Sequence, residues 1–257
     1  MQSTLKYRTT SIIALLAMLC SLVKHKVNVA VWRHWLAKGL KVKDFYIKPE
    51  HLIGDEASLR SLFHTQHPLA VQKCQPSLDK HAKNFISRSP FVCIGTQNFD
   101  GKADVSPRGD PVGFVKILDQ NTLVIPDRPG NNRLDSLANI LANPSVGLLF
   151  IVPGFDDTLR VNGVARLTND PNILQKMIVK ERVPSLAIIV SISEVFMHCS
   201  KAFRRSRLWD LDQFQDRKEM PSLANIILDQ TTGAPEDKDE MKQIDDDLEV
   251  EYNKTLY

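Results

Sequence analysis

The chain has 257 residues, of which 43% are hydrophobic, enough for one large domain with extensions or for two small ones. Its formal net charge of +3 gives no general case for nucleic-acid binding, which needs a basic domain with clustered Lys and Arg. The four cysteines are widely spaced and form no CxxC pair, so neither a disulfide framework nor a zinc site is supported, and reduced thiols in a cytoplasmic protein are expected.

The N-terminal segment is basic. Residues 1–43 contain no Asp or Glu but eight Lys or Arg, and they include the apolar run Ser11–Val23. This run is too short to span a bilayer, which needs about 20 residues. It resembles a signal-peptide core but lacks a clean cleavage site, and an organelle transit peptide is the other targeting interpretation. We therefore treat residues 1–44 as a basic, partly apolar extension. Membrane contact through it is an alternative that we do not favour.

Short helices followed by strands are predicted next. Residues 55–63 begin with an acidic turn and carry apolar residues on one face, as a short docked helix does. Residues 80–88 predict a second helix. Residues 91–96 predict the first strand of a barrel, and residues 98–102 predict its hairpin turn.

Residues 103–163 alternate apolar runs with turn residues. The runs at 113–119, 121–127, 145–153 and 158–167 are rich in Val, Ile, Leu and Phe and are bounded by Gly, Pro, Asn and Asp. This pattern is typical of strands joined by tight turns, so we predict a meander.

A helix is predicted inside this meander, because apolar residues fall at helical spacing between residues 134 and 141. Asn131 or Asn132 is expected to cap its start, and Asn143-Pro144 is expected to close its end.

Polar side chains gather at the loop that opens this helix, residues 127–133, with Ser136 one turn further on. A helix start offers unpaired N–H groups and about half a positive charge, so Arg and Asn side chains there would make an anion site suited to a phosphate. A second polar group lies at residues 104–110, where Pro107 and the following Pro111 imply an edge or a break in the sheet. A capped helix after a hairpin, beside a kinked edge strand, is the plain alternative.

The C-terminal third is predicted to hold a helix at 172–180 and a central strand at 184–195. Residues 196–210 then carry four cationic side chains beside Phe203 and Trp209. They predict either a solvated basic helix or one wall of a ligand cleft. Residues 234–257 form an acidic tail, in which the apolar side chains of Leu248, Tyr252 and Leu256, four residues apart, would allow a terminal helix to dock.

Three motifs, in this order along the chain, resemble the flavin-binding branch of the pyridoxamine 5'-phosphate oxidase-like, or flavin split-barrel, family: DVSPRGDPVGFVKILDQNTLVIPDRPGNNRLDSLANILANPSVGLLFIVPG, TLRVNG and HCSKAFRRSRLW. The resemblance implies a mainly β (α+β) fold, an FMN-binding split β-barrel with flanking helices. It places this domain at residues 45–233, with the barrel core at 90–200 and the tail at 234–257. It also implies a homodimer with FMN in a cleft shared by the subunits.

The resemblance further implies a flavoprotein, an FMN-dependent oxidoreductase acting on a small molecule, in which the flavin ring does the chemistry and no catalytic residue is assigned. The expected cofactor-binding residues are Asn131, Asn132, Arg133 and Ser136 at the phosphate, Ser106 and Arg108 along the ring or ribityl side, and Lys201, Arg207 and Trp209 closing the cleft. The alternatives are a non-catalytic module that holds flavin, deazaflavin or haem, and a structural dimer with an empty cleft.

One departure from the family pattern concerns the substrate. The vitamin B6 enzymes end in an Arg-Leu-His-Asp-Arg pattern that grips the substrate phosphate, whereas residues 207–211 here read RLWDL. Trp209 thus stands in place of the His and Leu211 in place of the second Arg. Losing a cation opposite a phosphate removes charge-assisted hydrogen bonds. We therefore expect that the chain is not a true pyridoxamine 5'-phosphate oxidase.

Overall fold

The computed structural model describes residues 38, 40–43 and 45–257, so the apolar run predicted at Ser11–Val23 lies outside the described residues. The chain divides into two compact units that meet at Pro68 and Leu69. Among the described residues no helix is both long and apolar enough to cross a membrane. The predicted boundaries at residues 44 and 233 stay a prediction.

The first unit is small and polar. Its elements are β1 (Leu40–Val42), β2 (Phe45–Ile47), η1 (Pro49–His51) and α2 (Glu56–Ser61), and β1 pairs with β2 antiparallel. The Asp55 carboxylate caps α2 by accepting the N–H of Ser58 at 2.8 Å. The predicted helix is thus confirmed, but its apolar side chains Leu62 and Phe63 are 63% and 69% exposed, so the expected docked face is not seen.

The second unit contains the sheet. Its strands are β3 (Phe91–Gln97), β4 (Ala103–Gly109), β5 (Lys116–Asp119), β6 (Thr122–Asp127), β7 (Ser145–Ile151), β8 (Thr158–Thr168) and β9 (Leu186–His198). Its helices are α3 (Pro68–Gln72), α4 (Lys80–Arg88), α5 (Asp135–Ala142), α6 (Pro171–Leu174), α7 (Lys201–Ser206), α8 (Leu223–Asp229) and α9 (Lys238–Thr255), with the 3-10 turns η2 (Gln175–Met177), η3 (Leu211–Gln213) and η4 (Arg217–Glu219).

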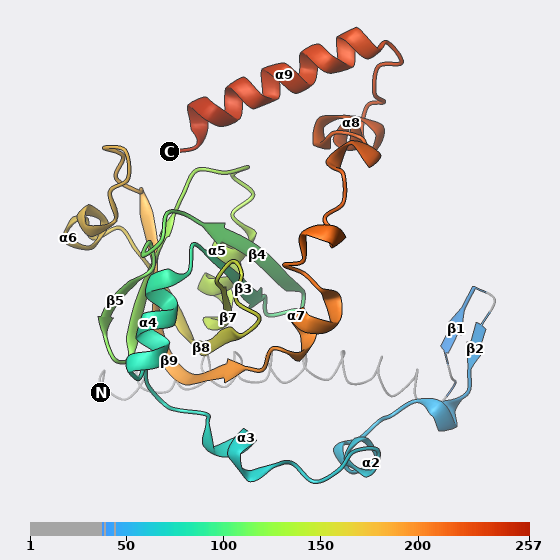
Figure 1. The fold of residues 1–257 in the computed structure, drawn as a ribbon, viewed down its shortest axis with the longest axis vertical. Helices are drawn as coiled ribbons and strands as arrows, with labels where there is room; N and C mark the ends of the chain where they lie inside the picture. Colours follow the sequence, from blue (N-terminus) through green and yellow to red (C-terminus); the bar gives the residue numbers. More distant parts are fainter. Residues whose placement is uncertain (1–37, 39, 44) are drawn as a thin grey trace, which may run out of the picture. The chain divides into compact units, whose positions relative to one another are not determined.

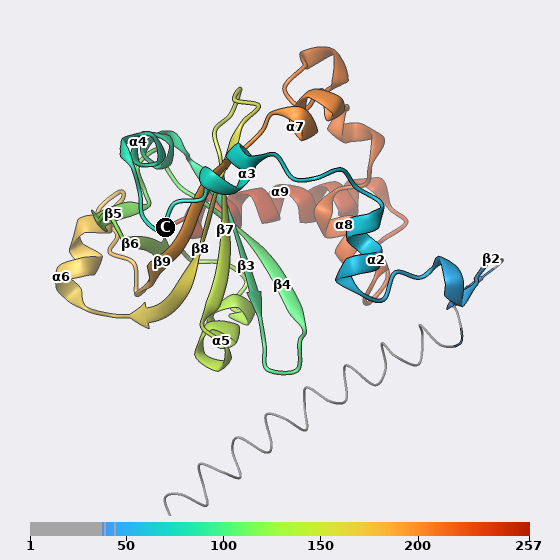
Figure 2. The same ribbon diagram turned by 90° about the horizontal axis from the view of Figure 1, so that it is seen from below.

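The seven strands form one antiparallel sheet in the order β4-β3-β7-β8-β9-β6-β5 (Figure 1). The strands β9, β8, β7, β3 and β4 lie side by side in Figure 2. The mainly β fold with flanking helices is therefore confirmed, as is the edge position of β4 that Pro107 predicted. The meander predicted over residues 113–167 is found only in part: β5 pairs with β6 and β7 pairs with β8, but β6 and β7 are not neighbours, because β9 lies between β8 and β6. The strand predicted at 184–195 is β9, and it is an inner strand as expected.

The core follows the alternation of the strands, because every second side chain of β3, β7 and β8 points inward. Helices α4 and α5 cover two opposite ends of this interior (Figure 2). The core members from these elements include Phe85, Ile86, Val92, Ile94, Leu137, Ile140, Leu148, Phe150, Leu159 and Val161.

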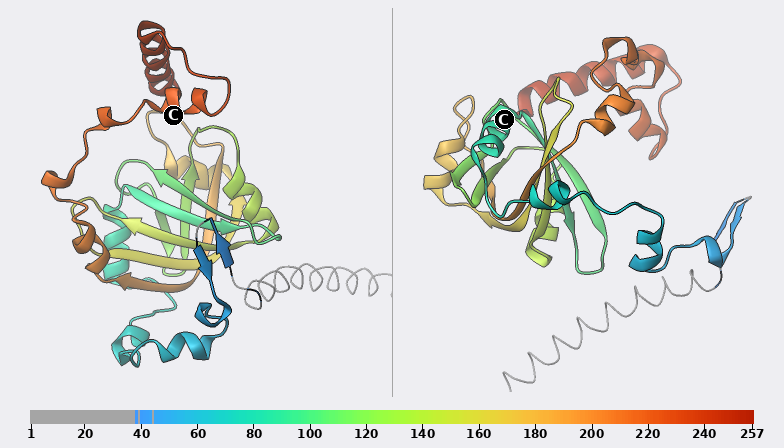
Figure 3. Two further views of the ribbon diagram at one scale, coloured as in Figure 1. Left: turned by 90° about the vertical axis from the view of Figure 1, so that its right-hand side faces the viewer. Right: turned by 60° about the horizontal axis from the view of Figure 1, so that its bottom comes forward.

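The sheet curls until its two sides meet. Four strands separate β4 from β6 in the sheet order, yet Arg108 on β4 pairs with Asp127 at the end of β6. A second ion pair follows directly, from Arg128 Nε to Asp110 Oδ2 at 2.6 Å. In the left view of Figure 3, strands on opposite sides of the barrel run in different directions, as this curvature requires.

The β8–β9 ladder contains a bulge between Asn162 and Gly163. A Cβ atom on Gly163 would lie 2.3 Å from the backbone oxygen of Ser191. Glycine is therefore needed here for close approach of the two backbones.

Three predictions about local structure are wrong. No side chain caps α5, because its N-terminal flanking residue is Leu134 in a left-handed conformation, so neither Asn131 nor Asn132 is the cap. The helix expected at 172–180 is shorter, since Lys180 and Glu181 are left-handed and turn the chain. The basic segment 196–210 is not one helix, because β9 continues to His198 before α7 begins.

Candidate functional site

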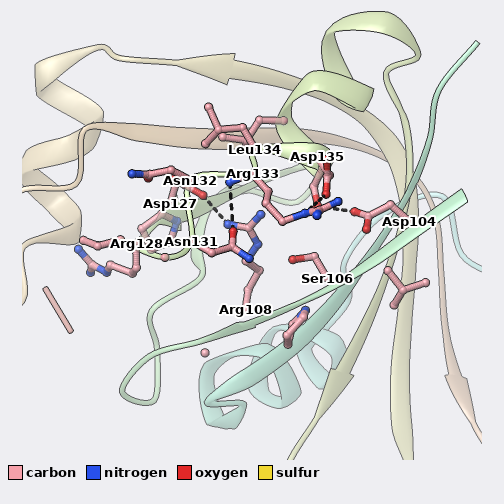
Figure 4. A pocket seen from close by; sticks show the side chains of 18 of the residues that line it. Asp104, Ser106, Arg108, Asp127, Arg128, Asn131, Asn132, Arg133, Leu134 and Asp135 are labelled. Carbon is pink, nitrogen blue, oxygen red and sulfur yellow. Dashed lines mark hydrogen bonds and ion pairs between the residues drawn. The ribbon is translucent and has the colours of Figure 1, made fainter. Parts of the chain in front are cut away.

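A pocket of about 530 Å³ opens between β4 and the loop of residues 127–134, which we call the pocket loop. This volume is in the range of small-molecule sites. Figure 4 shows Asp104, Ser106 and Arg108 along β4 facing the labelled residues of the pocket loop. The structure brings together six of the nine residues predicted to bind a cofactor: Ser106, Arg108, Asn131, Asn132, Arg133 and Ser136.

The pocket loop has an unusual backbone. Asn132 and Leu134 have φ angles of 55° and 59°, and Arg133 stands between them. Left-handed residues are one component of the nests of backbone N–H groups that bind anions, so this loop is a candidate for such a site. A left-handed leucine is strained, and Leu134 is 54% exposed, so burial in the core does not explain it. Strain of this kind is often stored at ligand sites.

Each pocket arginine has a carboxylate partner. The Arg108–Asp127 and Arg128–Asp110 pairs are shielded from water, and the Asp110 side chain is only 1% exposed. By contrast, Arg133 Nε lies 2.8 Å from Asp135 Oδ2, and these side chains are 68% and 49% exposed. An exposed pair contributes little free energy, so Arg133 can change partner most easily.

Arg108 also has one unpaired hydrogen-bond donor. Its Nε is buried and has no hydrogen-bond partner in the described part of the chain. Buried donors without partners are rare in folded proteins, and they call for an explanation such as a ligand or a water. Arg108 lines the β4 side of the pocket, so a polar ligand group or a water there is one way to complete this donor.

Ser136 is committed to a polar network inside the protein. Its Oγ donates to Asp104 Oδ2 at 2.7 Å, and the side chain is almost fully buried. Nearby, Asn139 Nδ2 donates to Thr96 Oγ1 at 3.0 Å. The network ties α5 to the β3–β4 hairpin. The role of Ser136 toward a phosphate stays a prediction, and its single hydroxyl hydrogen is already used here.

The other three predicted residues, Lys201, Arg207 and Trp209, do not line this pocket. They lie in and after α7, where Trp209 Nε1 donates to the Phe155 oxygen at 2.8 Å. Arg207 Nε donates to Asp210 at 2.9 Å, and this hydrogen bond lowers the pKa of Asp210. Within a single copy of the chain, Lys201, Arg207 and Trp209 are therefore not part of the pocket.

A cationic cluster that the sequence analysis missed lies where β8 begins and β9 ends. The Arg160 guanidinium carbon stacks 4.0 Å from the Phe196 ring centroid, and its Nη2 donates to Glu194 at 2.9 Å. Lys73 lies 5.2 Å from the same ring. Burial, then the charges of Arg160 and Lys73, lower the pKa of His198. The cluster forms across the register of β8 and β9, which places Arg160 opposite Phe196 and which no local sequence pattern marks.

Neither the Cys199 thiol nor a metal-binding cluster is supported as a functional site. The pKa of the Cys199 thiol is lowered, mainly by a hydrogen bond from the backbone of Lys201, but the cysteine is exposed and stands alone. The described residues contain no cluster of His, Cys, Asp and Glu that could hold a metal ion.

Comparison with family models gives a match over part of the chain. Residues 78–199 match the family model for pyridoxamine 5'-phosphate oxidase. No curated protein matched the chain.

Several solved structures are similar at low identity. The HupZ protein of Group A Streptococcus is 16% identical, with 47% of this chain and 93% of that chain covered and a TM-score of 0.38. An FMN-binding protein from Syntrophomonas wolfei is 8% identical, with 51% and 91% covered and a TM-score of 0.36. An FAD binding protein from Mycobacterium smegmatis is 15% identical, with 48% and 97% covered and a TM-score of 0.35.

Proposed function

From the match of residues 78–199 to the pyridoxamine 5'-phosphate oxidase family, we propose that the chain is a flavoprotein of that family and that it binds FMN in the pocket beside β4. One observation carries the proposal. The residues that resemble the family's phosphate-binding motif, Asn131, Asn132 and Arg133, converge on one side of that pocket, on a strained loop whose backbone suits an anion.

The donor set fits such a ligand. The exposed Arg133 would exchange Asp135 for the FMN phosphate, and a bidentate guanidinium–phosphate contact is a strong charge-assisted interaction. The Asn131 and Asn132 amides would add hydrogen bonds, and Ser106 with the spare Nε of Arg108 would face the ribityl or ring side. The shielded pairs of Arg108 and Arg128 would stay as the pocket wall.

The proposed active form is a homodimer. Lys201, Arg207 and Trp209 resemble the family's cleft-closing residues but do not line the pocket of their own chain. A second copy would supply them across a shared cleft, where a cation stabilises negative charge on a reduced flavin and an indole packs on an aromatic face. We place this dimer in the cytoplasm, in keeping with the free thiols of Cys74, Cys93 and Cys199.

The proposed activity is an oxidoreductase acting on a small molecule. FMN would supply the redox chemistry, and the protein would supply binding, orientation and electrostatics. Pyridoxamine 5'-phosphate is not the proposed substrate, because Leu211 stands where the vitamin B6 enzymes have an Arg. The alternative, a non-catalytic module for flavin, deazaflavin or haem, uses the same pocket with different ring contacts.

The absorbance spectrum of the purified full-length protein tests this proposal. A flavin spectrum, with FMN released on denaturation, is expected. A haem or deazaflavin spectrum would move the assignment to the alternative. A colourless protein that also fails to take up added FMN would contradict the proposal. Turnover of pyridoxamine 5'-phosphate by the FMN-loaded protein would contradict the substrate assignment, whereas reduction of the flavin by NADH or NADPH would support the oxidoreductase.

A further inference from the structure

Tyr257 contacts Asp110, and the proposed function does not use this contact. Helix α9 runs from α8 to the C-terminal residues, which lie beside the barrel in Figure 1. There the Tyr257 hydroxyl lies 2.9 Å from Asp110 Oδ1. A carboxylate can only accept, so the phenol is the donor. The other oxygen of the same carboxylate accepts from Arg128 Nε at 2.6 Å.

The Tyr257 ring lies near two cations. The guanidinium carbon of Arg128 lies 5.6 Å from its centroid, and Lys180 Nζ lies 5.1 Å from it. Cation–π contacts of this length are attractive, and more so where water is excluded. Burial first, and then Asp110, raise the pKa of the phenol, so it stays protonated and keeps donating. Tyr257 thus shields a carboxylate that is 1% exposed.

This contact is linked to the pocket through Arg128. Arg128 lines the pocket, and it begins the segment that leads to Asn131 and Arg133. Its Nη2 donates to the Met177 oxygen at 2.7 Å, so Asp110, Met177 and Tyr257 hold it from three directions. A loop with left-handed residues keeps its shape only where its surroundings over-determine it.

The helix that carries Tyr257 has little other anchorage. Along α9, Met241 is the buried residue and Leu248 is half-buried, whereas Tyr252 and Leu256, the other two members of the predicted apolar stripe, are 46% and 56% exposed. The last two residues of the predicted apolar stripe therefore do not hold the end of the helix to the barrel. The end of α9 is held instead by a polar and aromatic contact.

We infer that Tyr257 is a positioning residue: residues 238–257 form a strap whose last side chain fixes Arg128 and Asp110, and so holds the pocket loop in its ligand-binding shape. This inference rests on the proposed function for the identity of the ligand, but not for the contact itself. The plain alternative is that Tyr257 only stabilises the barrel. That alternative predicts lower stability with unchanged affinity of the folded protein for FMN.

The test uses the full chain with three variants. Tyr257→Ala removes both ring and hydroxyl, and Tyr257→Phe removes the hydrogen bond but keeps the ring between the cations. Tyr252→Ala is the matched control, since this exposed tyrosine lies on the same helix. Amide hydrogen exchange of residues 126–134 is measured without ligand, and FMN affinity is measured by quenching of flavin fluorescence.

We expect Tyr257→Ala to speed exchange in the pocket loop and to weaken FMN binding about tenfold, which is about 1.4 kcal/mol. Tyr257→Phe should show both effects to a smaller extent, and it keeps the test decisive if the alanine variant does not fold. Faster exchange with unchanged FMN affinity, or exchange equal to that of Tyr252→Ala, would overturn the inference. If the unmodified protein does not bind FMN, the proposed function fails, and the exchange rates alone decide whether Tyr257 holds the loop.

Discussion

The β7–β8–β9 meander and the pocket loop belong to the same unit, but different forces hold them. In the meander, Leu148, Phe150 and Leu159 are at most 1% exposed, and backbone pairing with one bulge joins the strands. In the pocket loop, ion pairs and two left-handed residues set the shape, and Leu134 is 54% exposed. A rigid apolar scaffold thus carries a polar site whose shape is set by contacts from elsewhere in the chain.

This difference implies that the two regions should respond to different changes. Apolar burial is non-directional and roughly proportional to area, so the meander should be sensitive to lost volume. The pocket loop depends on particular charged partners, so it should be sensitive to the removal of one atom group. The predictions below separate the two responses.

The largest effect is expected in the meander. Phe150 is fully buried on β7, and Phe150→Ala should lower the free energy of unfolding by about 3–5 kcal/mol through lost burial and a cavity. Denaturant unfolding measures it. Leu141→Ala is the control, because this side chain on α5 is 77% exposed and should change stability little. Equal losses of unfolding free energy in the two variants would contradict the view that apolar burial holds the meander.

The second effect tests the ion pairs of the pocket. Asp110→Ala leaves the shielded Arg128 without its carboxylate and should cost about 3 kcal/mol of stability or more. Asp135→Ala removes the partner of the exposed Arg133 and should cost about 1 kcal/mol or less. Thermal unfolding at low and moderate salt compares them. A loss for Asp135→Ala as large as that for Asp110→Ala would show that both pairs are structural.

The third effect tests how closely the meander strands approach. Gly163→Ala would place a Cβ 2.3 Å from the Ser191 oxygen, so the backbone must shift, at a cost of about 1–3 kcal/mol. Gly95→Ala on β3 is the control, because its Cβ would meet the Gly147 oxygen at an ordinary 3.6 Å. Chemical denaturation ranks the two variants. If both unfold at the same denaturant concentration, the bulge does not restrict this position.

The smallest effect concerns pH. The pKa of His198 is lowered by burial and by Arg160 and Lys73, so the unfolded chain takes up a proton more readily than the folded one. As the pH falls below 6.5, the ordinary pKa of histidine, the folded protein should therefore lose stability. Above that pH, His198 should have no effect on stability. His198→Gln should reduce the loss in melting temperature between about pH 7.5 and about pH 5.5. An unchanged pH profile would contradict this.

The sequence predicted the individual strands well because each carries its own signal, but it did not predict that β9 separates β8 from β6. The alternation at 145–153 and 158–167 is local, and the structure places β7 and β8 there. The helix at 80–88 was found with its end at Ser89 for the same reason, since its cap and its following proline lie in the chain next to it.

The pocket was predicted less completely because its contacts join distant residues. Arg133 and Ser106 were found through the resemblance of their motif, but Asp127 as the partner of Arg108 needs the barrel closure. The contact of Tyr257 with Asp110 spans 147 residues of chain, and no local pattern marks it. The left-handed Leu134 was missed because leucine favours helix and the Asn residues before it suggested an ordinary cap.

The measurement that tests the central claim most directly is a titration of the protein with FMN and with riboflavin, which differ in the phosphate. If the pocket loop binds that phosphate, FMN should bind far more tightly than riboflavin, and Arg133→Ala should weaken FMN by about 1.5–3 kcal/mol while leaving riboflavin nearly unchanged. Arg88→Ala, an exposed cation on α4, should change neither affinity. Equal affinity for FMN and riboflavin would contradict the account.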